Sequence, residues 1–523
     1  MLNGDGNESK CVSDEGLSPK WLNDYAETAS HLNLDESGFH PVHGTTLFVA
    51  KTLVPTLYGD FTAHIFQDMI HKGYLIALIY GDVYADGELY TRMHSSCITS
   101  ETLGGCDCDC VQQLEEAMRT IAARGRGILF YLLQEGRGVG YCGKARDRML
   151  VQASQDTLST FDAYRLLGLR KDYRSYLNIA DITKILRIDA DWVLLTNNPD
   201  KVEGMRRNGL RVVRSEPLEF EPGPFNQFYL KSKMESGHTL TQTDRHPLAE
   251  ITLPEEVKPF KPHRLEGVER FIYMASYLLP IQALNNEVIV SYEAARSLTG
   301  ERELEDLMAG NHAPLAGYES LRGNRLSIEL RPSGMEELQR LDSEDPLLQL
   351  RYIPYWFRVH VYFDIASGDD FVILTYGNPA SYETPIVRVQ SESILNRFPV
   401  QFDANKVKYQ HAVQRIVRYG AGAIVLVHQD GRGAGFGAFA LDRMLMEEGK
   451  SRTTEASYKR MGVPFDQRDY TRVFEILKSH LPNRNIQMIM NSPNSMVQKS
   501  EYAQALNESG LNVVNWIFLE SEL

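Results

Sequence analysis

The stretch Gln134-Glu-Gly-Arg-Gly-Val-Gly140 occurs twice in this chain, the second time as Gln429-Asp-Gly-Arg-Gly-Ala-Gly435. Further matches lie in the same order and at nearly the same offset, a pattern that chance similarity does not produce. They join Asp147-Arg-Met-Leu150 to Asp442-Arg-Met-Leu445, Leu167–Arg174 to Met461–Arg468, Asn197-Asn-Pro199 to Asn491-Ser-Pro493, and Arg92–Cys97 to Arg388–Ser393. The sequence therefore predicts a fold that is duplicated in tandem.

Short apolar and β-branched segments alternate with segments of helical spacing in the first copy. Strands are expected at Leu75–Tyr80, Gly127–Leu133 and Trp192–Thr196, and a helix at Val111–Ala123. This alternation indicates an α/β (α+β) fold around a mixed sheet. Helix is also expected within His263–Tyr277, in a segment without a counterpart in the first copy.

The 523 residues suggest two to four domains, at about 100–200 residues each. Residues 1–40 are polar and aperiodic, which predicts a disordered acidic leader. The first copy is placed at 41–245 and the second, degenerate copy at 351–523. Between them lie a Pro- and charge-rich linker, 246–262, and a segment of unknown role, 263–350.

Composition and charge exclude several classes of protein. Hydrophobic residues make up 43% and charged residues 24%, as in ordinary soluble globular proteins. The net charge of −14 argues against broad nucleic-acid binding, which needs a basic face. No apolar run approaches the roughly 20 residues that span a bilayer, and the N-terminus lacks the apolar segment of a signal peptide. A cytoplasmic protein without membrane or nucleic-acid partners is expected.

Cys97, Cys108 and Cys110 have the spacing C-x10-C-x-C. Three thiolates can bind zinc and leave a fourth position open, which is typical of catalytic sites. A disulfide cluster or a structural zinc loop is the alternative, but without secretion clustered cysteines are more often metal ligands or catalytic groups. Cys106 fits the spacing less well and is left out of the predicted site.

The second copy lacks this ligand set. The positions of the three cysteines are taken by Ser393, Ala404 and Lys406, and Gln390 aligns with His94. A lysine ammonium would repel a zinc ion. The fold can survive these changes but metal catalysis cannot, so one zinc ion is predicted per chain, in the first copy.

Residues suited to phosphate binding surround the cysteines in the first copy. Arg137 stands in a glycine-rich turn, where backbone N–H groups can approach an anion and the guanidinium can grip its oxygens. Lys201 follows an expected strand end, and Asp172 precedes Arg174 by two residues. Each feature alone also fits a plain turn, a solvated lysine or an ordinary ion pair.

Together these motifs resemble the GTP cyclohydrolase II family, the zinc enzymes that open riboflavin biosynthesis. The similar region runs from Leu53 to Leu240, and the second copy looks like the same domain in degenerate form. The motifs that carry the resemblance are Arg92-Met-His-Ser95, the three cysteines, Gln113-Leu-Glu115, Gln134–Arg137, Asp156-Thr157, Asp172-x-Arg174 and Thr196–Lys201.

The resemblance implies roles for these residues. The three cysteines would hold Zn²⁺, whose hydroxide would attack C8 of guanine before release of formate. Arg174 matches the family's nucleophile on the α-phosphate and Asp172 the neighbouring proton acceptor, with Mg²⁺ on the phosphates. The implied substrate-binding residues are Arg92, His94, Ser95, Gln113, Glu135, Gly136, Arg137, Thr157, Thr196 and Lys201.

Two positions depart from the family. Ser96 stands where the family has a glutamate, and Arg148 where it has a tyrosine near the reacting ring. Some relatives act in uracil catabolism, so a uridine nucleotide is an alternative substrate to GTP. A non-catalytic nucleotide-binding regulator is a further alternative. Similar enzymes are commonly homodimers, so the copies are expected to form an internal pseudo-dimer; a homodimer, or two domains on a flexible tether, remain as alternatives.

Overall fold

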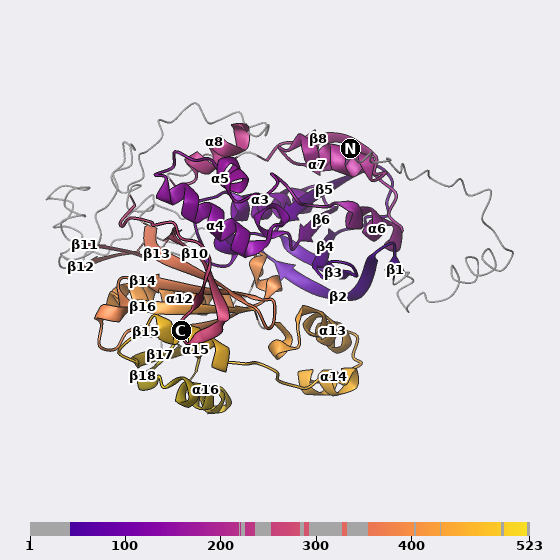
Figure 1. Cartoon of the computed structure of the whole chain (residues 1–523). Helices are drawn as coiled ribbons and strands as arrows, with labels where there is room; N and C mark the ends of the chain where they lie inside the picture. Colours follow the sequence, from indigo (N-terminus) through magenta and orange to yellow (C-terminus); the bar gives the residue numbers. More distant parts are fainter. Residues whose placement is uncertain are drawn as a thin grey trace, which may run out of the picture.

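The structure, a computed structural model, contains two eight-stranded mixed sheets, one in each half of the chain (Figure 1). The described residues are 42–218, 220, 225–235, 253–282, 287–291, 327–331, 354–401, 404–428, 430–492 and 496–519. The leader predicted at 1–40 lies outside them. Among the described residues, no helix has both the length and the apolar character needed to cross a membrane.

The first sheet has the strand order β1-β2-β3-β4-β6-β5-β7-β8. Strands β1 to β4 and β6 pair antiparallel, whereas β5 pairs parallel with both β6 and β7, and β7 pairs parallel with β8. The strands are β1 (Val42–His43), β2 (Thr46–Thr56), β3 (Gly59–Asp68), β4 (Tyr74–Tyr80), β5 (Glu88–Ser95), β6 (Gly127–Leu132), β7 (Asp191–Leu195) and β8 (Val212–Glu216). The helices are α2 (Ile98–Glu101), α3 (Cys110–Ala123), α4 (Gly140–Ala153), α5 (Thr160–Leu166), α6 (Leu177–Ile185), α7 (Pro199–Arg207) and α8 (Gln227–Glu235), with the 3-10 helix η2 at Glu135–Gly138.

The second sheet repeats this order as β9-β10-β13-β14-β16-β15-β17-β18. Its strands are β9 (His263–Leu265), β10 (Val268–Gln282), β13 (Pro354–Asp364), β14 (Asp370–Tyr376), β15 (Ile386–Glu392), β16 (Gly422–His428), β17 (Asn485–Met490) and β18 (Asn512–Phe518). The 3-10 helices are η3 (Pro379–Ser381), η4 (Ile394–Arg397) and η5 (Asp430–Gly433), and the α-helices are α12 (Ala404–Tyr419), α13 (Phe436–Glu447), α14 (Thr454–Met461), α15 (Thr471–Ser479) and α16 (Met496–Ser509). The predicted duplication of a mixed-sheet fold is confirmed.

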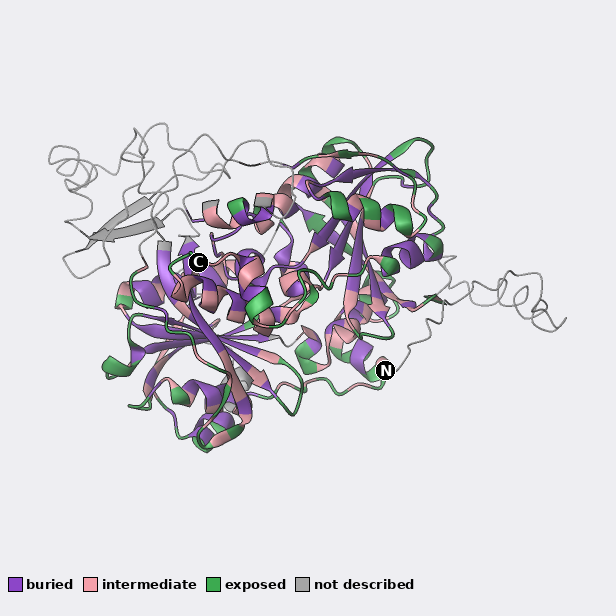
Figure 2. Ribbon diagram, turned by 45° about the horizontal axis from the view of Figure 1, so that its top comes forward, coloured by how far each residue is buried: buried purple, intermediate pink, exposed green. Residues whose placement is uncertain are grey.

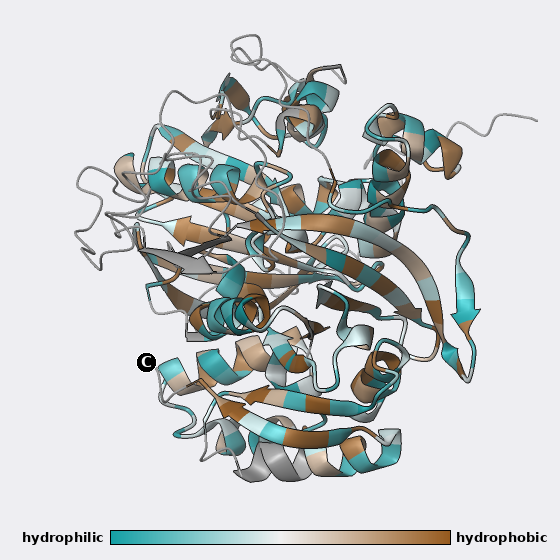
Figure 3. Ribbon diagram, turned by 90° about the vertical axis from the view of Figure 1, so that its left-hand side faces the viewer, coloured by the Kyte–Doolittle hydropathy of each residue, from teal (hydrophilic) through white to brown (hydrophobic). Residues whose placement is uncertain are grey.

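The expected strands and the expected helix of the first copy are present as β4, β6, β7 and α3. Every residue of β6 is buried, because this strand lies inside the sheet with side chains packed on both faces. Purple, buried strands run through both sheets in Figure 2. In Figure 3 brown, hydrophobic stretches follow the strands, and the helices carry teal, hydrophilic residues on their outward sides.

The helix expected within His263–Tyr277 is wrong. This segment forms β9 and most of β10, and β10 pairs with β13 from Phe271 to Gln282. β10 is the counterpart of β2, but residues 283–353 separate it from β13, whereas only Leu57 and Tyr58 separate β2 from β3. The inserted segment contains a parallel pair, β11 (Glu287–Ser291) and β12 (Ser327–Arg331). The second copy therefore begins earlier than the sequence repeat alone shows.

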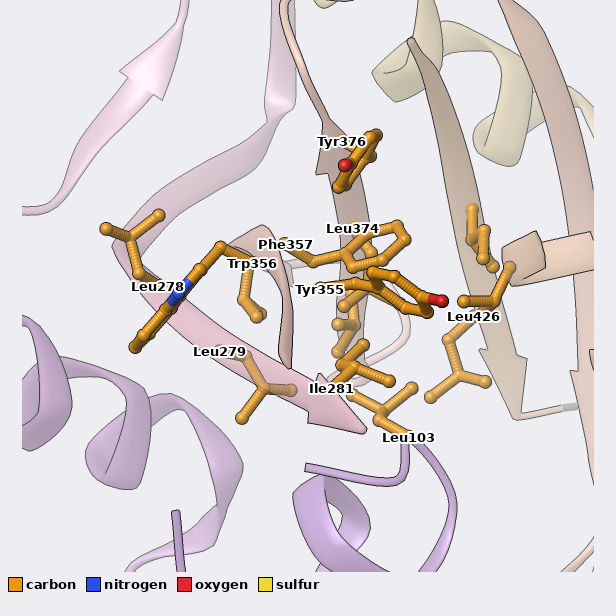
Figure 4. Close-up of a cluster of buried hydrophobic side chains, with 14 of the residues drawn as sticks. Leu103, Leu278, Leu279, Ile281, Tyr355, Trp356, Phe357, Leu374, Tyr376 and Leu426 are labelled. Atoms are coloured by element: carbon orange, nitrogen blue, oxygen red, sulfur yellow. The ribbon is translucent and has the colours of Figure 1, made fainter. Parts of the chain in front are cut away.

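The two copies pack against each other through reciprocal contacts. Helix α4 of the first copy lies on β10 of the second, and its counterpart α13 lies on β2 of the first. Tyr141 of α4 and Tyr277 of β10 join their hydroxyl groups at 2.7 Å. Figure 4 shows the shared core, in which Leu103 of the first copy lies beside Ile281 of the second. Such an exchange of equivalent elements is the pattern of an isologous interface.

Candidate active site

One cavity lies at the carboxyl ends of the parallel strands β5, β6 and β7. Residues that end these strands, or follow them directly, line it together with residues of the helices α3, α4, α5, α7 and α8. The lining residues are Arg92, His94, Ser95, Ser96, Cys97, Cys110, Gln113, Gln134, Glu135, Gly136, Arg137, Lys144, Asp147, Arg148, Thr160, Tyr164, Arg174, Thr196, Asn197, Asn198, Lys201, Tyr229 and Lys233. The fold therefore gathers most of the sequence-predicted residues in one place.

The three predicted metal ligands lie together, and two of them, Cys97 and Cys110, line this cavity. The Sγ atoms of Cys97 and Cys108 are 3.7 Å apart, and with Cys110 Sγ all three lie within 4.8 Å of one another. Thiolates on one tetrahedral zinc ion, at about 2.3 Å each, stand about 3.8 Å apart. The donor set and its spacing fit zinc. Cys106 Sγ instead donates to the Pro280 carbonyl at 3.1 Å, which keeps it out of the cluster.

Lys144 and Glu135 support the thiol cluster. Lys144 Nζ lies 3.1 Å from Cys97 Sγ and donates to Glu135 Oε1 at 2.6 Å. Hydrogen bonding from the neighbouring thiols, with help from this ammonium group, lowers the pKa of Cys97 well below its ordinary value. Burial raises the pKa of Glu135 to about 7 despite Lys144. A thiolate at Cys97, the form that binds metals, is thus favoured.

Positively charged side chains also line the cavity, among them Arg92, Arg174, Lys201 and Lys233. Burial, and then repulsion by Arg92 and Arg174, lower the pKa of Lys201 well below its ordinary value. Burial lowers the pKa of Arg92 to about 10, and its Nε makes no hydrogen bond within the described part of the chain. Buried cations that repel one another and keep unused donors form a site for an anion of high charge.

The glycine-rich turn holds Gly136 and Arg137 in left-handed conformations, with φ of 57° and 58°. Such a conformation costs a residue other than glycine on the order of 1–3 kcal/mol, and it is retained where the surrounding structure requires it. Here the Arg137 carbonyl accepts from Tyr173 N at 3.0 Å, and the Gly136 carbonyl accepts from the Tyr164 hydroxyl at 2.8 Å. The first bond docks the turn onto the loop that carries Arg174, and the second docks it onto α5.

Asp172 and Arg174 form a two-pronged ion pair on this loop. Arg174 Nε lies 3.0 Å from both carboxylate oxygens, and Nη2 donates to Oδ2. Burial alone would lower the pKa of Arg174, but the carboxylate outweighs it and leaves that pKa above its ordinary value. Asp172 does not line the cavity itself; it holds Arg174 toward it.

Arg148, one of the two positions that depart from the family, is fixed by neighbours. Its Nη1 lies 3.1 Å from Asp107 Oδ2, and its guanidinium lies 5.3 Å from the ring centre of Tyr229. Next to it, buried Asp147 has an Oδ1 without a hydrogen-bond partner in the described part of the chain, and burial raises the pKa of this carboxyl group to about 7. This wall of the cavity is polar and charged.

Thr157 does not line the cavity, unlike the other implied substrate-binding residues. Its side chain is exposed, and the hydroxyl donates to the Ser154 carbonyl at 2.8 Å. Thr160, three residues further along and buried, lines the cavity instead. The structure thus places Thr160 at the cavity, and a substrate contact of Thr157 stays a prediction.

Several lining residues were missed by the sequence analysis. Lys144 and Asp147 have the spacing i, i+3 on α4 and share one helix face with Arg148, the position that the resemblance had already placed near the reacting ring. That spacing could have identified them. Tyr229 and Lys233 stand four residues apart on α8, and no local signal in the sequence connects them with the site.

Comparison with known proteins agrees with this geometry. A family model described as GTP cyclohydrolase II matches residues 48–217 and again 348–517. The chain is 40% identical over 195 residues to the GTP cyclohydrolase-2 of Hahella chejuensis, covering 37% of this chain and 92% of that protein. It is 41% identical over 197 residues to the enzyme of the same name from Azotobacter vinelandii (38% and 93% covered). It is 38% identical over 189 residues to the riboflavin biosynthesis protein RibBA of Chlorobium phaeovibrioides (36% and 45% covered).

Proposed function

Because this chain belongs to the GTP cyclohydrolase II family, we propose that its first copy is a zinc-dependent hydrolase that opens the guanine ring of GTP. The products would be formate, diphosphate and 2,5-diamino-6-ribosylamino-pyrimidinone 5′-phosphate, an early step of riboflavin biosynthesis. One observation carries the proposal. A three-thiol cluster and a set of buried cations meet at one cavity, so a nucleotide bound there can have its ring at the metal and its phosphates on the cations.

At the thiol end, zinc held by Cys97, Cys108 and Cys110 would supply a bound water of lowered pKa for attack on the ring. The protein's own groups hold this end in place. Lys144 balances the negative charge of the thiolates, and Glu135 ties Lys144 to the start of α2 by accepting from Ile98 N at 2.9 Å.

At the phosphate end, Arg92, Lys201 and Lys233 would neutralise the triphosphate together with the turn at Gly136–Arg137. Each of these cations already has a partner that fixes its direction. Lys201 Nζ donates to the Met93 carbonyl at 2.7 Å, and Lys233 Nζ donates to Asp109 Oδ1 at 2.5 Å. Mg²⁺ would bind through the phosphate oxygens, as it commonly does.

Release of diphosphate would depend on Asp172 and Arg174. In the role that the family resemblance gives them, an Arg174 nitrogen bonds to the α-phosphorus while the bond to diphosphate breaks. The nitrogen's proton passes to the Asp172 carboxylate, and water later cleaves the nitrogen–phosphorus bond. A guanidinium is normally never deprotonated, so this step needs an acceptor already in contact, and both carboxylate oxygens contact Arg174.

The base side of the cavity favours a second candidate, a uridine nucleotide opened in uracil catabolism. Arg148 replaces the tyrosine near the reacting ring and is fixed by Asp107 and Tyr229, so it is not free to take over the tyrosine's part. Ser96, at the family's glutamate position, is buried and also lines the cavity. An enzyme that acts on a base other than guanine would need a different base pocket, but it could keep the metal and phosphate sites.

Incubation of the purified full-length chain with GTP and with uridine nucleotides tests both candidates. Formate, diphosphate and loss of ring absorbance are measured in parallel, with the Cys108→Ser variant as control. Turnover of GTP supports the first proposal and turnover of a uridine nucleotide supports the second. Binding of either nucleotide without any turnover would contradict both and favour a nucleotide-binding regulator.

The second copy is proposed to act as the structural partner of the first, so that one chain forms an internal pseudo-dimer. The support is the reciprocal packing of α4 on β10 and α13 on β2. Self-association of whole chains and a cytoplasmic location stay predictions. Light scattering of the full-length chain measures the first of these.

A further inference from the structure

Glu101 and Arg397 occupy equivalent positions in the two copies. Glu101 ends α2, which starts directly after Cys97, and Arg397 ends η4, which starts directly after Ser393. Both side chains are buried, at 2% and 5% exposure, although one comes from the catalytic copy and the other from the degenerate copy. In a pseudo-symmetric pair, equivalent positions near the axis face each other, and here they carry opposite charges.

The two side chains meet on Tyr131. Arg397 Nη1 donates to the Tyr131 hydroxyl at 3.4 Å, and that hydroxyl donates to Glu101 Oε2. Arg397 is held in turn by its own copy, since its Nε donates to Glu392 Oε1 at 2.6 Å. Phe398 packs edge-on against the Tyr131 ring with centroids 4.9 Å apart. A buried arginine of the second copy therefore reaches a central strand of the first.

The same contacts continue into the active-site cavity. The other oxygen of Glu101, Oε1, lies 2.7 Å from His94 Nε2, and the His94 ring stacks on Tyr131 at 5.7 Å. A carboxylate can only accept, so Nε2 carries the hydrogen and the neutral ring presents Nδ1 as an acceptor. His94 is 2% exposed, lines the cavity, and its Nδ1 has no partner among the described residues.

We propose that Arg397 is a positioning residue of the first copy's active site: through Tyr131 and Glu101 it fixes the ring and tautomer of His94, whose free Nδ1 accepts a hydrogen bond from the nucleotide. The proposal rests on the proposed function of that cavity. Without Arg397, the buried Glu101 carboxylate loses the cation that Tyr131 links to it, and a buried charge that loses its counter-charge is strongly unfavourable. Glu101 would then no longer be held against His94, and His94 would lose its fixed tautomer.

The charge difference also explains why this role belongs to the second copy. If two first copies associated in the same geometry, Glu101 would face Glu101 in a buried place, and like charges there repel. Arg397 at the equivalent position removes this repulsion. The degenerate copy thus provides a contact that a second catalytic copy would not.

The experiment compares Arg397→Met with Arg443→Met. Arg443 is also an arginine of the second copy that reaches the first, where it donates to Thr52 Oγ1 at 2.8 Å and to the Leu53 carbonyl at 3.0 Å, but it does not line the cavity. Both full-length variants are checked for cooperative melting and zinc content. Then kcat, KM and the ¹⁵N signals of His94, assigned with His94→Gln, are measured.

Arg397→Met is expected to lower kcat by about 10–100-fold, the usual cost of losing an outer-shell partner, while KM changes little because the cations set it. The His94 signals of Arg397→Met should show mixed tautomers. Arg397→Lys should restore part of the lost kcat and part of the single-tautomer signal, and Arg443→Met should match the wild type. Wild-type His94 signals in Arg397→Met, or a kcat within twofold of Arg443→Met, would overturn the proposal.

Two further results stay decisive. If Arg397→Met does not fold, Tyr131→Phe removes only the linking hydroxyl and is held to the same two criteria. If the wild type turns over no nucleotide, the proposed function fails, and the His94 signals alone still decide whether Arg397 positions the ring.

Discussion

The two copies share a backbone but differ in the chemistry that it holds. Gly136 and Arg137 have φ values of 57° and 58°, and their counterparts Gly431 and Arg432 have 59° and 53°. Asp466 and Arg468 repeat the two-pronged ion pair, and Gln467 N donates to the Arg432 carbonyl at 2.9 Å as Tyr173 N does to Arg137. The glycine-rich turn and the Asp-x-Arg loop are thus kept as a docked unit of structure.

The second copy differs from the first at positions that line the first copy's cavity. Tyr409 stands in place of Gln113, and its hydroxyl donates to the Leu103 carbonyl of the first copy at 3.0 Å. Glu392 stands in place of Ser96 and accepts from Thr102 Oγ1 of the first copy at 2.6 Å. Positions that line the cavity in the first copy thus hold the interface in the second. A motif of turn and ion pair therefore identifies the fold, whereas the thiols and the buried cations identify the catalytic copy.

The largest difference between the copies should be metal binding. Cys108→Ser is expected to lower zinc content from about one ion per chain and to reduce ring opening by more than the ~10–100-fold cost of an outer-shell change. The matched substitution in the second copy, Ala404→Ser, should alter neither. Elemental analysis and the formate assay measure both effects. Zinc retained by the Cys108→Ser chain would place the metal elsewhere and break the comparison.

A second test compares Arg174→Ala with Arg468→Ala. Arg174 is the proposed nucleophile on the α-phosphorus, so its loss should cost at least the factor on the order of 10²–10³ in rate that the loss of one transition-state contact typically costs. Diphosphate release should fall accordingly while zinc content stays unchanged. Arg468 forms the same ion pair without a thiol cluster beside it, so its loss should leave turnover intact. Equal losses in the two variants would show that both loops act on the substrate.

Much of the difference between the two copies could be predicted from the sequence. The collinear matches revealed the duplication, and uninterrupted apolar runs such as Gly127–Leu132 marked buried strands. β10 was missed for physical reasons. Both of its faces are buried beyond Ala275, and a register shift between Tyr273 and Ala275 interrupts its pairing with β13, so its sequence lacks the alternation of a strand.

The site was predictable where it depends on spacing and not where it depends on packing. The three cysteines and Arg174 lie in short motifs, so the sequence identified them. Tyr229 reaches the cavity through the placement of α8, and Arg397 reaches His94 through the pairing of the copies. Contacts between distant segments leave no local signal in one sequence.

A third test uses Lys201, a buried lysine of the first copy whose counterpart in the second copy is Ser495. The pKa of Lys201 is well below its ordinary value because of burial, Arg92 and Arg174, and bound phosphates would raise it again. Binding therefore takes up a proton, and affinity should fall as pH rises through the lowered pKa of the free protein. Lys201→Met should abolish this dependence and weaken tripolyphosphate binding roughly 10–100-fold, the loss of one charge-assisted contact. Calorimetry in two buffers of different ionisation enthalpy counts the protons, and equal proton uptake by Lys201→Met would assign them to another group.

The smallest expected effect tests the symmetry of the pairing itself. Gln152 on α4 accepts from Leu278 N and donates to its carbonyl, both at 2.7 Å, and the equivalent Glu447 on α13 accepts from Leu53 N at 3.1 Å and from Thr52 Oγ1 at 2.5 Å. Each side chain thus satisfies the backbone of the other copy's strand, and losing such a bond costs about 1 kcal/mol. Gln152→Ala and Glu447→Ala should each lower the melting temperature by about 2–4 °C, with Gln152→Ala at the upper end because it leaves two buried backbone groups unsatisfied. Scanning calorimetry of the full-length chain should show one transition that moves in both variants. A shift in only one variant, or two transitions that respond separately, would mean that the copies unfold independently and that their reciprocal contacts do not couple them.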